Sequence, residues 1–415
     1  MMAQLTGGKE IPKEVVVQIA AKSDGVPLFV EELTQMVVES GLLREVDGCY
    51  ELRGPLPPLA IPPTLQDSLT ARLDRLSSVR ESVQLAAVLG REFNYELIRA
   101  VSPLDDVALA QHLEQLVTSE FLYQRGMPPE SGYIFKHALI QDAAYNSLLI
   151  SRRQQYHQQL AQVLEERFLE VVQTQPELVG HHYTQAGLYQ QAVTYWQQAG
   201  QIAMRRSANV EAVNHLQRGL ALLETLPDSP DRVLQEVTLQ TMLGQSSMQI
   251  RGWAAPEVQQ AFGRARELIG QIGETPQYFQ VMFGLYLYFQ VRAEYQSALE
   301  VAEQCLEAAQ RTHEPFPLLV AHRVLGCTLV QIGKPAPARE HLLEAIYRHD
   351  IEHHRSLAQI YGQEPASAAR IWLARNLWLL GYPDQAASHT QEAIALAQEL
   401  SHPFSLCFVD VNAAW

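Results

Sequence analysis

Apolar residues recur at helical spacing over most of the chain. The stretch "DGVPLFVEEL" (24–33) begins with a turn signal and then carries apolar residues three and four positions apart. A proline at the first helical position costs little, because the first amides of a helix have no partner within it. We therefore expect an amphipathic helix from Pro27 to about Gly41. Its apolar face comprises Leu28, Phe29, Leu33, Met36 and Val37.

A different pattern occupies residues 54–171. The stretch "GPLPPLAIPPT" (54–64) is rich in proline and predicts an extended linker, with Thr64 capping the next helix. Apolar spacing then predicts helices over about 65–76, 83–89, 95–101 and 107–117. The β-prone runs "FLYQR" and "GYIFK", separated by "GMPPES", predict one small β-hairpin. Helices followed by two strands is the order expected of a winged helix, and further helices follow from His137 onward.

From about residue 172 the pattern becomes a series of helix pairs. Residues 179–199 carry small side chains at Gly180, Ala192 and Ala199 and large ones at Tyr183 and Trp196. Antiparallel helices need small residues where their backbones approach and large ones in the gaps between them. The same register recurs over 285–305, 325–345 and 373–393, with a weaker copy over 243–265. The pattern resembles the tetratricopeptide repeat, with intervals longer than its usual roughly 34 residues.

A solenoid of such repeats presents a concave groove to a partner. Polar side chains and an aromatic on the groove would suit a protein or a peptide. The alternative interpretation is an ordinary solvated surface, since exposed polar residues are the default. The repeat register assigns to the groove Gln280, Gln290, Arg323, Gln331, Arg375 and Trp378.

Composition and charge narrow the possible partners. The chain has 415 residues, 47% of them hydrophobic and 19% charged, which is typical of a folded globular protein. Since it contains neither an apolar run of membrane-spanning length nor a signal peptide, we expect a cytoplasmic protein. A net charge of −15 disfavours binding to nucleic acid or to anionic membranes. The expected recognition helix "DVALAQHLEQLVT" also lacks Lys and Arg, so we expect no DNA contact from the winged helix.

The sequence gives little support for a metal site. The cysteines lie far apart without a CxxC motif, which argues against a zinc site and against a disulfide framework. In "YRHDIEHHRS", His349 and His353 would share a helical face as a pair of metal ligands does. Because zinc needs three or four placed ligands, we expect no metal there. His181 and His182 lie beside the core of the first repeat and are expected at its rim.

Several motifs taken together resemble a known family. They are "DGVPLFVEEL", "IPPTLQDSLTARLDRL", "LGREF" and "YIFKHALIQDAAYNSLL", followed by the repeats. This combination resembles the C-terminal part of bacterial signal-transduction ATPases with numerous domains, of the type fused to a class III adenylate or guanylate cyclase. The resemblance implies a mainly α fold with a helical lid remnant over 1–53, a linker over 54–64, a winged helix with trailing helices over 65–171, and a tetratricopeptide-type α-solenoid over 172–415. The ending "VDVNAAW" resembles the first helix of another repeat, so we expect the solenoid to be truncated there.

The resemblance also implies roles for two residues. Pro27 would approach the adenine base of a bound nucleotide, and His137 would reach its β-phosphate. For His137 the alternative is a histidine at a helix start that is hydrogen-bonded within the wing. A P-loop needs GxxxxGK[ST], whereas "GGKE" places Glu10 after Lys9, and Ala3 stands where the first glycine should be. This chain alone is therefore expected to bind no cofactor and to be no enzyme, with ATP or ADP and Mg²⁺ held in the parent protein.

Three functions remain open at this point. The first is a regulatory and sensor segment that binds a protein or peptide and controls a cyclic-nucleotide cyclase through upstream ATPase and cyclase domains. The second is part of a class III cyclase whose catalytic and P-loop domains lie upstream. The third is a transcription regulator of the maltose-regulator type, which the acidic winged helix makes less favoured.

Overall fold

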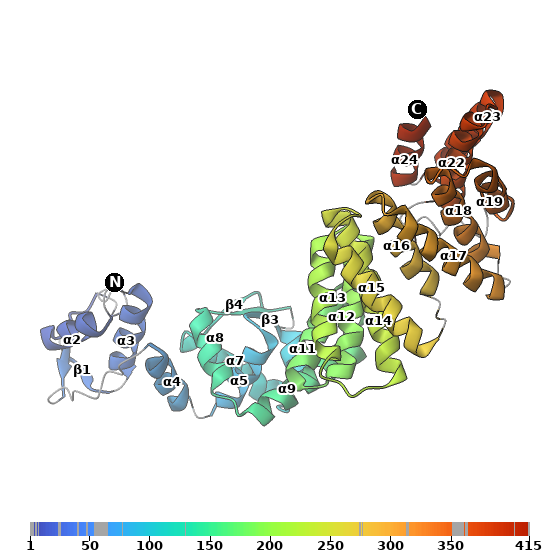
Figure 1. Cartoon of the computed structure of the whole chain (residues 1–415). Coiled ribbons are helices and arrows are strands. Elements are labelled where there is room, and N and C mark those ends of the chain that lie inside the picture. Colours follow the sequence, from blue (N-terminus) through green and yellow to red (C-terminus); the bar gives the residue numbers. More distant parts are fainter. Residues whose placement is uncertain are drawn as a thin grey trace. The chain divides into compact units, whose positions relative to one another are not determined.

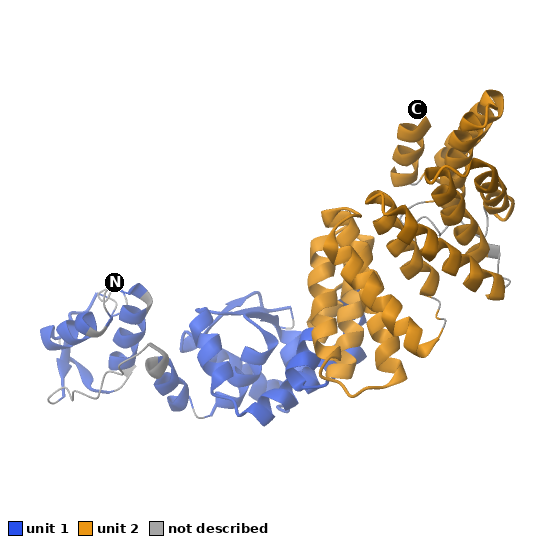
Figure 2. Ribbon diagram, viewed as in Figure 1, with its two compact units in different colours: residues 1–173, 181–188 blue, residues 174–180, 189–415 orange. Residues whose placement is uncertain are grey.

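The computed structural model divides the chain into two compact units, which are described one at a time (Figure 2). Unit 1 comprises residues 1–173 and 181–188, and unit 2 comprises residues 174–180 and 189–415. Both units are mainly α-helical, which confirms the predicted fold class (Figure 1). The structure describes residues 4, 6, 8–23, 26–39, 41–46, 49–53, 65–76, 78–128, 130–273, 275, 277–312, 315–350, 361, 364–401 and 403–413.

The first part of unit 1 is a pair of helices with a small hairpin. Helix α2 spans Lys13–Ser23 and α3 spans Pro27–Glu39, so the helix predicted to begin at Pro27 is confirmed. Strand β1 (Leu43–Val46) pairs antiparallel with β2 (Cys49–Leu52), a hairpin that the sequence pattern did not indicate. Both helices and β1 contribute to a small apolar core of Val15, Ile19, Phe29, Leu33, Met36, Val37 and Leu43. The side chain of Leu28, the linker over 54–64 and its capping residue Thr64 lie outside the described part.

The second part of unit 1 combines helices with a three-stranded sheet. The strand order is β3-β5-β4 with antiparallel pairing throughout, and β4 with β5 is the predicted hairpin. Strand β3 is an addition, because three residues are too few to show the alternation that indicates a strand. The elements are α4 (Leu65–Arg75), α5 (Arg80–Leu89), β3 (Glu92–Asn94), α6 (Tyr95–Val101), α7 (Asp106–Thr118), β4 (Leu122–Arg125), β5 (Gly132–Phe135), α8 (Ala138–Asn146), α9 (Ile150–Arg167) and α10 (Leu169–Thr174).

Aromatic side chains form the core of this sheet. Phe93 of β3 stacks on Tyr133 of β5, with ring centroids 5.6 Å apart, and its ring lies 6.3 Å from that of Phe135. All three rings are buried, together with most side chains of α5. The third strand therefore completes the apolar layer against which α5 packs.

Unit 2 is an array of helices in two layers (Figure 1). From α12 onward each described helix packs against the next one, and α14, α16, α18, α22 and α24 also make contacts in that order. This is the arrangement of a tetratricopeptide-type solenoid, as predicted. The helices are α11 (Pro176–Ala186), whose residues from 181 onward belong to unit 1, α12 (Tyr189–Arg205), α13 (Asn209–Leu223), α14 (Pro230–Arg251), α15 (Pro256–Ile272), α16 (Tyr278–Val291), α17 (Tyr295–Thr312), α18 (Pro315–Gln331), α19 (Pro335–Tyr347), α22 (Pro365–Leu379), α23 (Pro383–Leu400) and α24 (Pro403–Ala413).

Glycines allow neighbouring helices of this array to approach closely. A Cβ atom on Gly180 would lie 3.3 Å from the ring of Trp196, where the sequence predicted a small residue opposite a large one. On Gly326 the same atom would lie only 2.7 Å from Leu342. The pairing of small and large residues at these two places agrees with the predicted repeat register.

The last helix, α24, begins where another first helix was predicted. It packs against α22 and α23 through Val409, which is fully buried. Phe404 at its start lies 5.4 Å, between ring centroids, from Trp253 in the turn between α14 and α15. Across the described ranges no helix is both long enough and apolar enough to cross a membrane.

Candidate functional site

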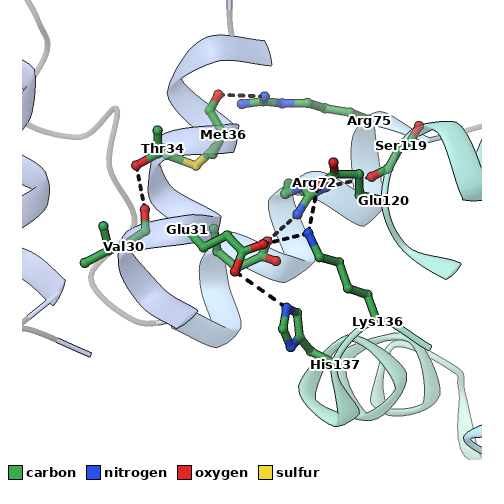
Figure 3. A network of polar contacts seen from close by, with 11 residues as sticks. Val30, Glu31, Thr34, Met36, Arg72, Arg75, Ser119, Glu120, Lys136 and His137 are labelled. Atoms are coloured by element: carbon green, nitrogen blue, oxygen red, sulfur yellow. Dashed lines mark hydrogen bonds and ion pairs between the residues drawn. The ribbon is translucent and has the colours of Figure 1, made fainter. Parts of the chain in front are cut away.

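A group of charged residues, called here the α3 charge cluster, lies at the second turn of α3 (Figure 3). It consists of Glu31, Glu32, Arg72, Lys136 and His137. Glu32 and Arg72 form an ion pair in which each side chain is only 2% exposed. Arg72 comes from α4, while Lys136 and His137 precede α8, so the cluster joins α3 to the sheet-containing part of unit 1.

Arg72 is held by three kinds of contact. Besides the ion pair, its Nη2 atom donates a hydrogen bond to the carbonyl of Ser119 at 2.9 Å. Its guanidinium carbon lies 4.7 Å from the ring centroid of Phe121. A buried charge is costly unless it is paired and hydrogen-bonded. The ion pair with Glu32 therefore depends on α3 staying packed against α4.

Lys136 links two carboxylates at the edge of the same cluster. Its Nζ atom donates to Glu31 Oε1 at 2.6 Å and to Glu120 Oε2 at 2.8 Å. Burial lowers the pKa of Lys136, but the hydrogen bonds to Glu120 and Glu31 outweigh it and the net shift is upward. The ammonium group consequently stays charged and neutralises part of the negative charge beside His137.

Pro27 and His137, the two residues predicted to contact a nucleotide, lie near the same face of α3. Pro27 is the first residue of α3 and is exposed. Glu31 lies four positions later and therefore on the same helix face. Its Oε2 atom lies 3.8 Å from Nε2 of His137. His137 occupies the N-cap position of α8 without a side-chain cap bond, and its Nε2 is buried without a hydrogen-bond partner among the described residues.

The positions assigned to the solenoid groove differ in exposure. Gln331 is exposed, and Trp378 is 68% exposed. Gln280, Gln290 and Arg375 are half-buried. These five residues lie on α16, α18 and α22, which are alternate helices of one layer. The five residues thus lie on one layer, and their place in a partner-binding groove stays a prediction.

Arg323 does not line an open groove, which corrects the prediction. It is only 2% exposed, and its guanidinium carbon lies 5.0 Å from the ring centroid of Phe283 on α16. Tyr361, from the connection that follows α19, packs edge-on against the same Phe283 ring at 5.2 Å. Periodicity predicts the face of α18 on which Arg323 lies, but it does not predict which aromatic rings cover that face.

The structure adds side chains to the end of α22 that the repeat register did not select. Leu379 is 67% exposed, and Tyr382, in the turn that follows, is 44% exposed. Arg375 lies over the ring of Trp372, with 5.3 Å between the guanidinium carbon and the ring centroid. Apolar residues three and four positions after Arg375 share its face, so this spacing in "RNLWLLGY" was the available signal.

A hollow of about 530 Å³ lies at the start of α14 and the end of α15. Its charged lining is paired within the chain: Arg232 with Asp228, and Arg264 with Glu236 at 2.8 Å. A ligand would have to compete with these carboxylates for the arginines. The hollow is therefore a weaker candidate than the exposed end of α22.

Histidine pairs occur in both units, buried in unit 1 and half-buried in unit 2. In unit 1, Nδ1 of His157 lies 2.8 Å from Nδ1 of His182, and Nε2 of His157 lies 2.9 Å from the hydroxyl of Tyr145. Burial lowers the pKa of His157 to about 4 and that of His182 to about 3. His182 is therefore a core residue and not the rim residue expected from sequence. In unit 2, His322 and His341 form a similar pair at 2.9 Å.

His349 is placed differently from the sequence expectation. It lies after the end of α19 and not on a helix, so it has no helical face to share with another ligand. Its Nε2 atom lies 3.5 Å from Glu364, the buried residue that caps α22. His353 lies outside the described residues. Across the part of the chain that the structure describes, no three His, Cys, Asp or Glu side chains gather as metal ligands would.

Comparison with known proteins gives one relative by sequence. No family model matches the chain. An uncharacterized protein of Rhizobium meliloti is 26% identical over 391 residues, which cover 92% of this chain and 37% of that protein. The chain therefore spans well under half of this curated relative.

Solved structures with a similar arrangement share little sequence with the chain. A signal-transduction ATPase with numerous domains and a tetratricopeptide repeat sensor, from Pyrococcus horikoshii, is 11% identical, with 97% of this chain and 60% of that one covered and a TM-score of 0.40. A Rap protein complexed with competence and sporulation factor is 14% identical, with coverage of 66% and 74% and a TM-score of 0.42. NprR in complex with its cognate peptide NprX is 12% identical, with coverage of 76% and 80% and a TM-score of 0.40. At these identities the likeness concerns no more than the fold.

Proposed function

We propose that this chain is the regulatory, partner-binding portion of a larger signalling ATPase and has no catalysis of its own. The observation that carries the proposal is the exposed end of α22. Trp378 and Leu379 each leave about two thirds of their surface open to water, at 68% and 67% exposure. Neighbouring exposed apolar side chains on a folded protein mark interaction sites, and tryptophan is enriched at the energetic centres of interfaces. A protein or peptide is the partner that such a surface suits.

The α3 charge cluster supports a second element of the proposal, a contact with nucleotide. The buried Nε2 of His137 has no hydrogen-bond partner among the described residues, and a phosphate oxygen would supply one. Lys136 offsets the negative charge of Glu31 next to it. We propose that Pro27 and His137 contribute contacts to ATP or ADP whose phosphates and Mg²⁺ are held mainly by a P-loop in the parent protein.

The proposed mechanism is a two-state equilibrium within the parent protein. A partner on the solenoid would favour one state, and the nucleotide contact at His137 would favour the other. A ligand shifts such an equilibrium only by its difference in affinity for the two states, and a few kcal/mol is sufficient. Control of a cyclic-nucleotide cyclase is the output that we propose. The element order α5, β3, α6, α7, β4, β5 supports treating the second part of unit 1 as a winged helix within this machinery.

Two alternatives remain. In the first alternative the chain is part of a class III cyclase, and the catalytic and P-loop domains lie upstream. This alternative treats the whole protein as the enzyme, whereas the first proposal treats this chain as the regulator of one. A DNA-binding role is less favoured, because α7, the helix that would enter the major groove, has no Lys or Arg. Phosphate contacts and base contacts both depend on those side chains.

Calorimetric titration of the purified chain with ATP and ADP tests the nucleotide element. We expect no binding tighter than about 100 μM, because the P-loop that should supply most of the affinity is not in this sequence. Tighter binding that disappears in His137→Ala would show that this chain forms a complete nucleotide site, and would contradict the dependence on a P-loop elsewhere.

The genomic reading frame upstream of Met1 tests the signalling element. An open frame that encodes a P-loop and a cyclase domain would support it, and cyclic-nucleotide production by that longer protein should then change in Trp378→Ala. A stop codon directly upstream, with no such domains in frame, would instead identify a free-standing adaptor and remove the proposed control of a cyclase.

A further inference from the structure

Aromatic, aliphatic and arginine side chains lie together at the exposed end of α22. We call this group the α22 strip and define it by Trp372, Arg375, Trp378, Leu379 and Tyr382. Within α22 the spacing of three and four positions places Trp372, Arg375, Trp378 and Leu379 on one face of the helix, and Tyr382 lies in the turn that follows. The exposed fraction rises toward the end of the helix, where Trp378 and Leu379 are at 68% and 67%, and Tyr382 is at 44%.

Two arginines in this region stack on aromatic rings. Arg375 lies over Trp372 with 5.3 Å between the guanidinium carbon and the ring centroid. Arg339, from α19, lies over Tyr382 at 5.5 Å. Within the described residues neither guanidinium forms an ion pair with a carboxylate. Stacking fixes the plane of a guanidinium and leaves its N–H edge available for a partner.

Two other arginines of the same repeats pair with carboxylates. Arg370, on another side of α22, lies 3.5 Å from the carboxylate of Glu392, and Arg348 forms an ion pair with Glu344. The whole chain has 46 acidic and 31 basic residues, so carboxylates are in excess. Arg375 and Arg339 differ from these two arginines, because they stack on rings and form no ion pair with a carboxylate among the described residues, in a chain of net charge −15.

The chemistry of the expected ligand follows from the two stacked arginines and from the exposed apolar side chains beside them. A guanidinium edge binds a carboxylate through two parallel hydrogen bonds, and such charge-assisted bonds are among the strongest in proteins. Trp378 and Leu379 supply apolar surface next to them that water would otherwise cover. A segment with an apolar side chain and acidic residues beside it would satisfy both features at once. A basic segment would leave its own charge facing two guanidinium groups.

We infer that the α22 strip binds an acidic–apolar segment of another protein, with carboxylates on Arg375 and Arg339 and an apolar side chain against Trp378 and Leu379. This inference rests on the proposed function, because it specifies the partner of a solenoid that is proposed to bind protein or peptide. It differs from the groove predicted by the repeat register in using α19 together with the end of α22, and in leaving the buried Arg323 out.

Selection from a random peptide library displayed on phage, against the immobilised full chain, tests the inference. Enriched peptides should carry Asp or Glu beside an aromatic or aliphatic residue. Their affinity, measured by fluorescence anisotropy, should fall about tenfold or more in Arg375→Gln and in Arg339→Gln, because each loses a charge-assisted contact. Arg370→Gln is the matched control on the same helix and should leave the affinity unchanged.

The outcomes separate the inference from the proposed function. The inference would be overturned if the enriched peptides were basic, or if their affinity were unchanged by both arginine substitutions. The proposed role of the solenoid as a peptide-binding domain would still stand in that case. Failure to enrich any peptide would count against both. Self-association of the chain that is lost in Trp378→Ala would also overturn the inference, because the occupant would then be a second copy. Circular dichroism spectra that match the unmodified chain exclude unfolding as the cause of lost binding.

Discussion

Phe262 of α15 shows how single glycines determine the packing of the helical array. Its ring is 1% exposed and lies against Gly244 of α14 and Gly284 of α16. A Cβ atom on Gly244 would be 2.7 Å from the ring, closer than real carbon contacts allow. Since the ring is enclosed by two helices, it has little freedom to move away.

Gly244→Ala should therefore destabilise the protein by about 1–3 kcal/mol, the usual cost of overpacking a core. Gly263→Ala, within α15, is the control: its Cβ would meet nothing within 4 Å. Alanine is the better helix former, so this change should be neutral or stabilise by up to about 1 kcal/mol. Urea unfolding followed by tryptophan fluorescence measures both. Equal effects of the two substitutions would contradict the close approach at Phe262.

The buried pair His157 and His182 links protonation to the stability of unit 1. In a contact between two Nδ1 atoms one ring donates its N–H, and the other ring must be unprotonated at Nδ1 to accept it. For His157, burial is the main cause of the lowered pKa, followed by the positive charges of His181 and Arg153. For His182, burial again comes first, followed by the two neighbouring histidines.

Acid should destabilise unit 1 through this pair. The folded-state pKa values, about 4 and about 3, lie below the ordinary value of 6.5, so the unfolded chain binds more protons below that pH. The stabilisation is complete above pH 6.5 and is lost as the pH falls toward 4. Between pH 7 and pH 5 we expect a loss of about 1–2 kcal/mol per histidine.

Urea denaturation monitored by hydrogen exchange of α9 at both pH values measures this loss of stability. The double variant with His157→Gln and His182→Gln should lose much less stability over that range, and an unchanged pH dependence in it would contradict the assignment.

At the scale of elements, α3 is held to α4 by a buried charge pair. Glu32 and Arg72 are both at 2% side-chain exposure, and Arg72 is further bonded to the carbonyl of Ser119 after α7. This pair ties three elements that are far apart in sequence. The burial of these two charges depends on α3 staying packed against α4, because separation of the helices would expose both side chains to water.

Glu32→Gln should loosen α3 from α4. It leaves the Arg72 charge buried without its carboxylate, a change that typically costs about 3–5 kcal/mol. Hydrogen exchange of the α3 and α4 amides should become faster. Glu51→Gln removes the exposed partner of Arg44 and serves as a control with an expected cost below about 1 kcal/mol. Replacing Glu32→Met together with Arg72→Leu should recover much of the loss, and no recovery would show that the charges themselves are required.

Helix α22 is fixed at its start by a second buried acid. Glu364 is 1% exposed, accepts a hydrogen bond from the amide of Ala366 at 2.8 Å, and its own amide donates to Ser405 of α24 at 2.9 Å. A capped and anchored start holds the helix in one orientation. The exposed strip at the other end of α22 is thus presented on a rigid element, which lowers the entropic cost of binding a partner.

At the scale of the whole molecule, two units with separate apolar cores divide the proposed tasks. Unit 1 contains the α3 charge cluster, with the candidate nucleotide contacts Pro27 and His137. Unit 2 contains the solenoid and its candidate partner site. The net charge of −15 makes general binding to nucleic acid unfavourable. It also repels an acidic protein partner, so the affinity for the proposed partner has to come from specific contacts such as those at Arg375.

The sequence by itself determined the features that depend on neighbours along the chain. The start of α3 at Pro27, the β4–β5 hairpin and the helix pairs with small residues such as Gly180 follow from local spacing and turn chemistry. These signals are strong because helical periodicity extends over many residues. The three-residue strand β3 was not predicted, although the helices around it were. It becomes a strand through its pairing with β5, which local sequence does not reveal.

Only the tertiary structure decided which distant side chains meet. It buried Arg323 against Phe283, paired His182 with His157, brought His349 to Glu364 and placed Arg339 over Tyr382. In each case the partner comes from a different helix, strand or connection, and its identity depends on how those segments pack. Burial and pairing set the charge, pKa and accessibility of a side chain, so the sequence could name candidate residues while their chemical roles depended on the fold.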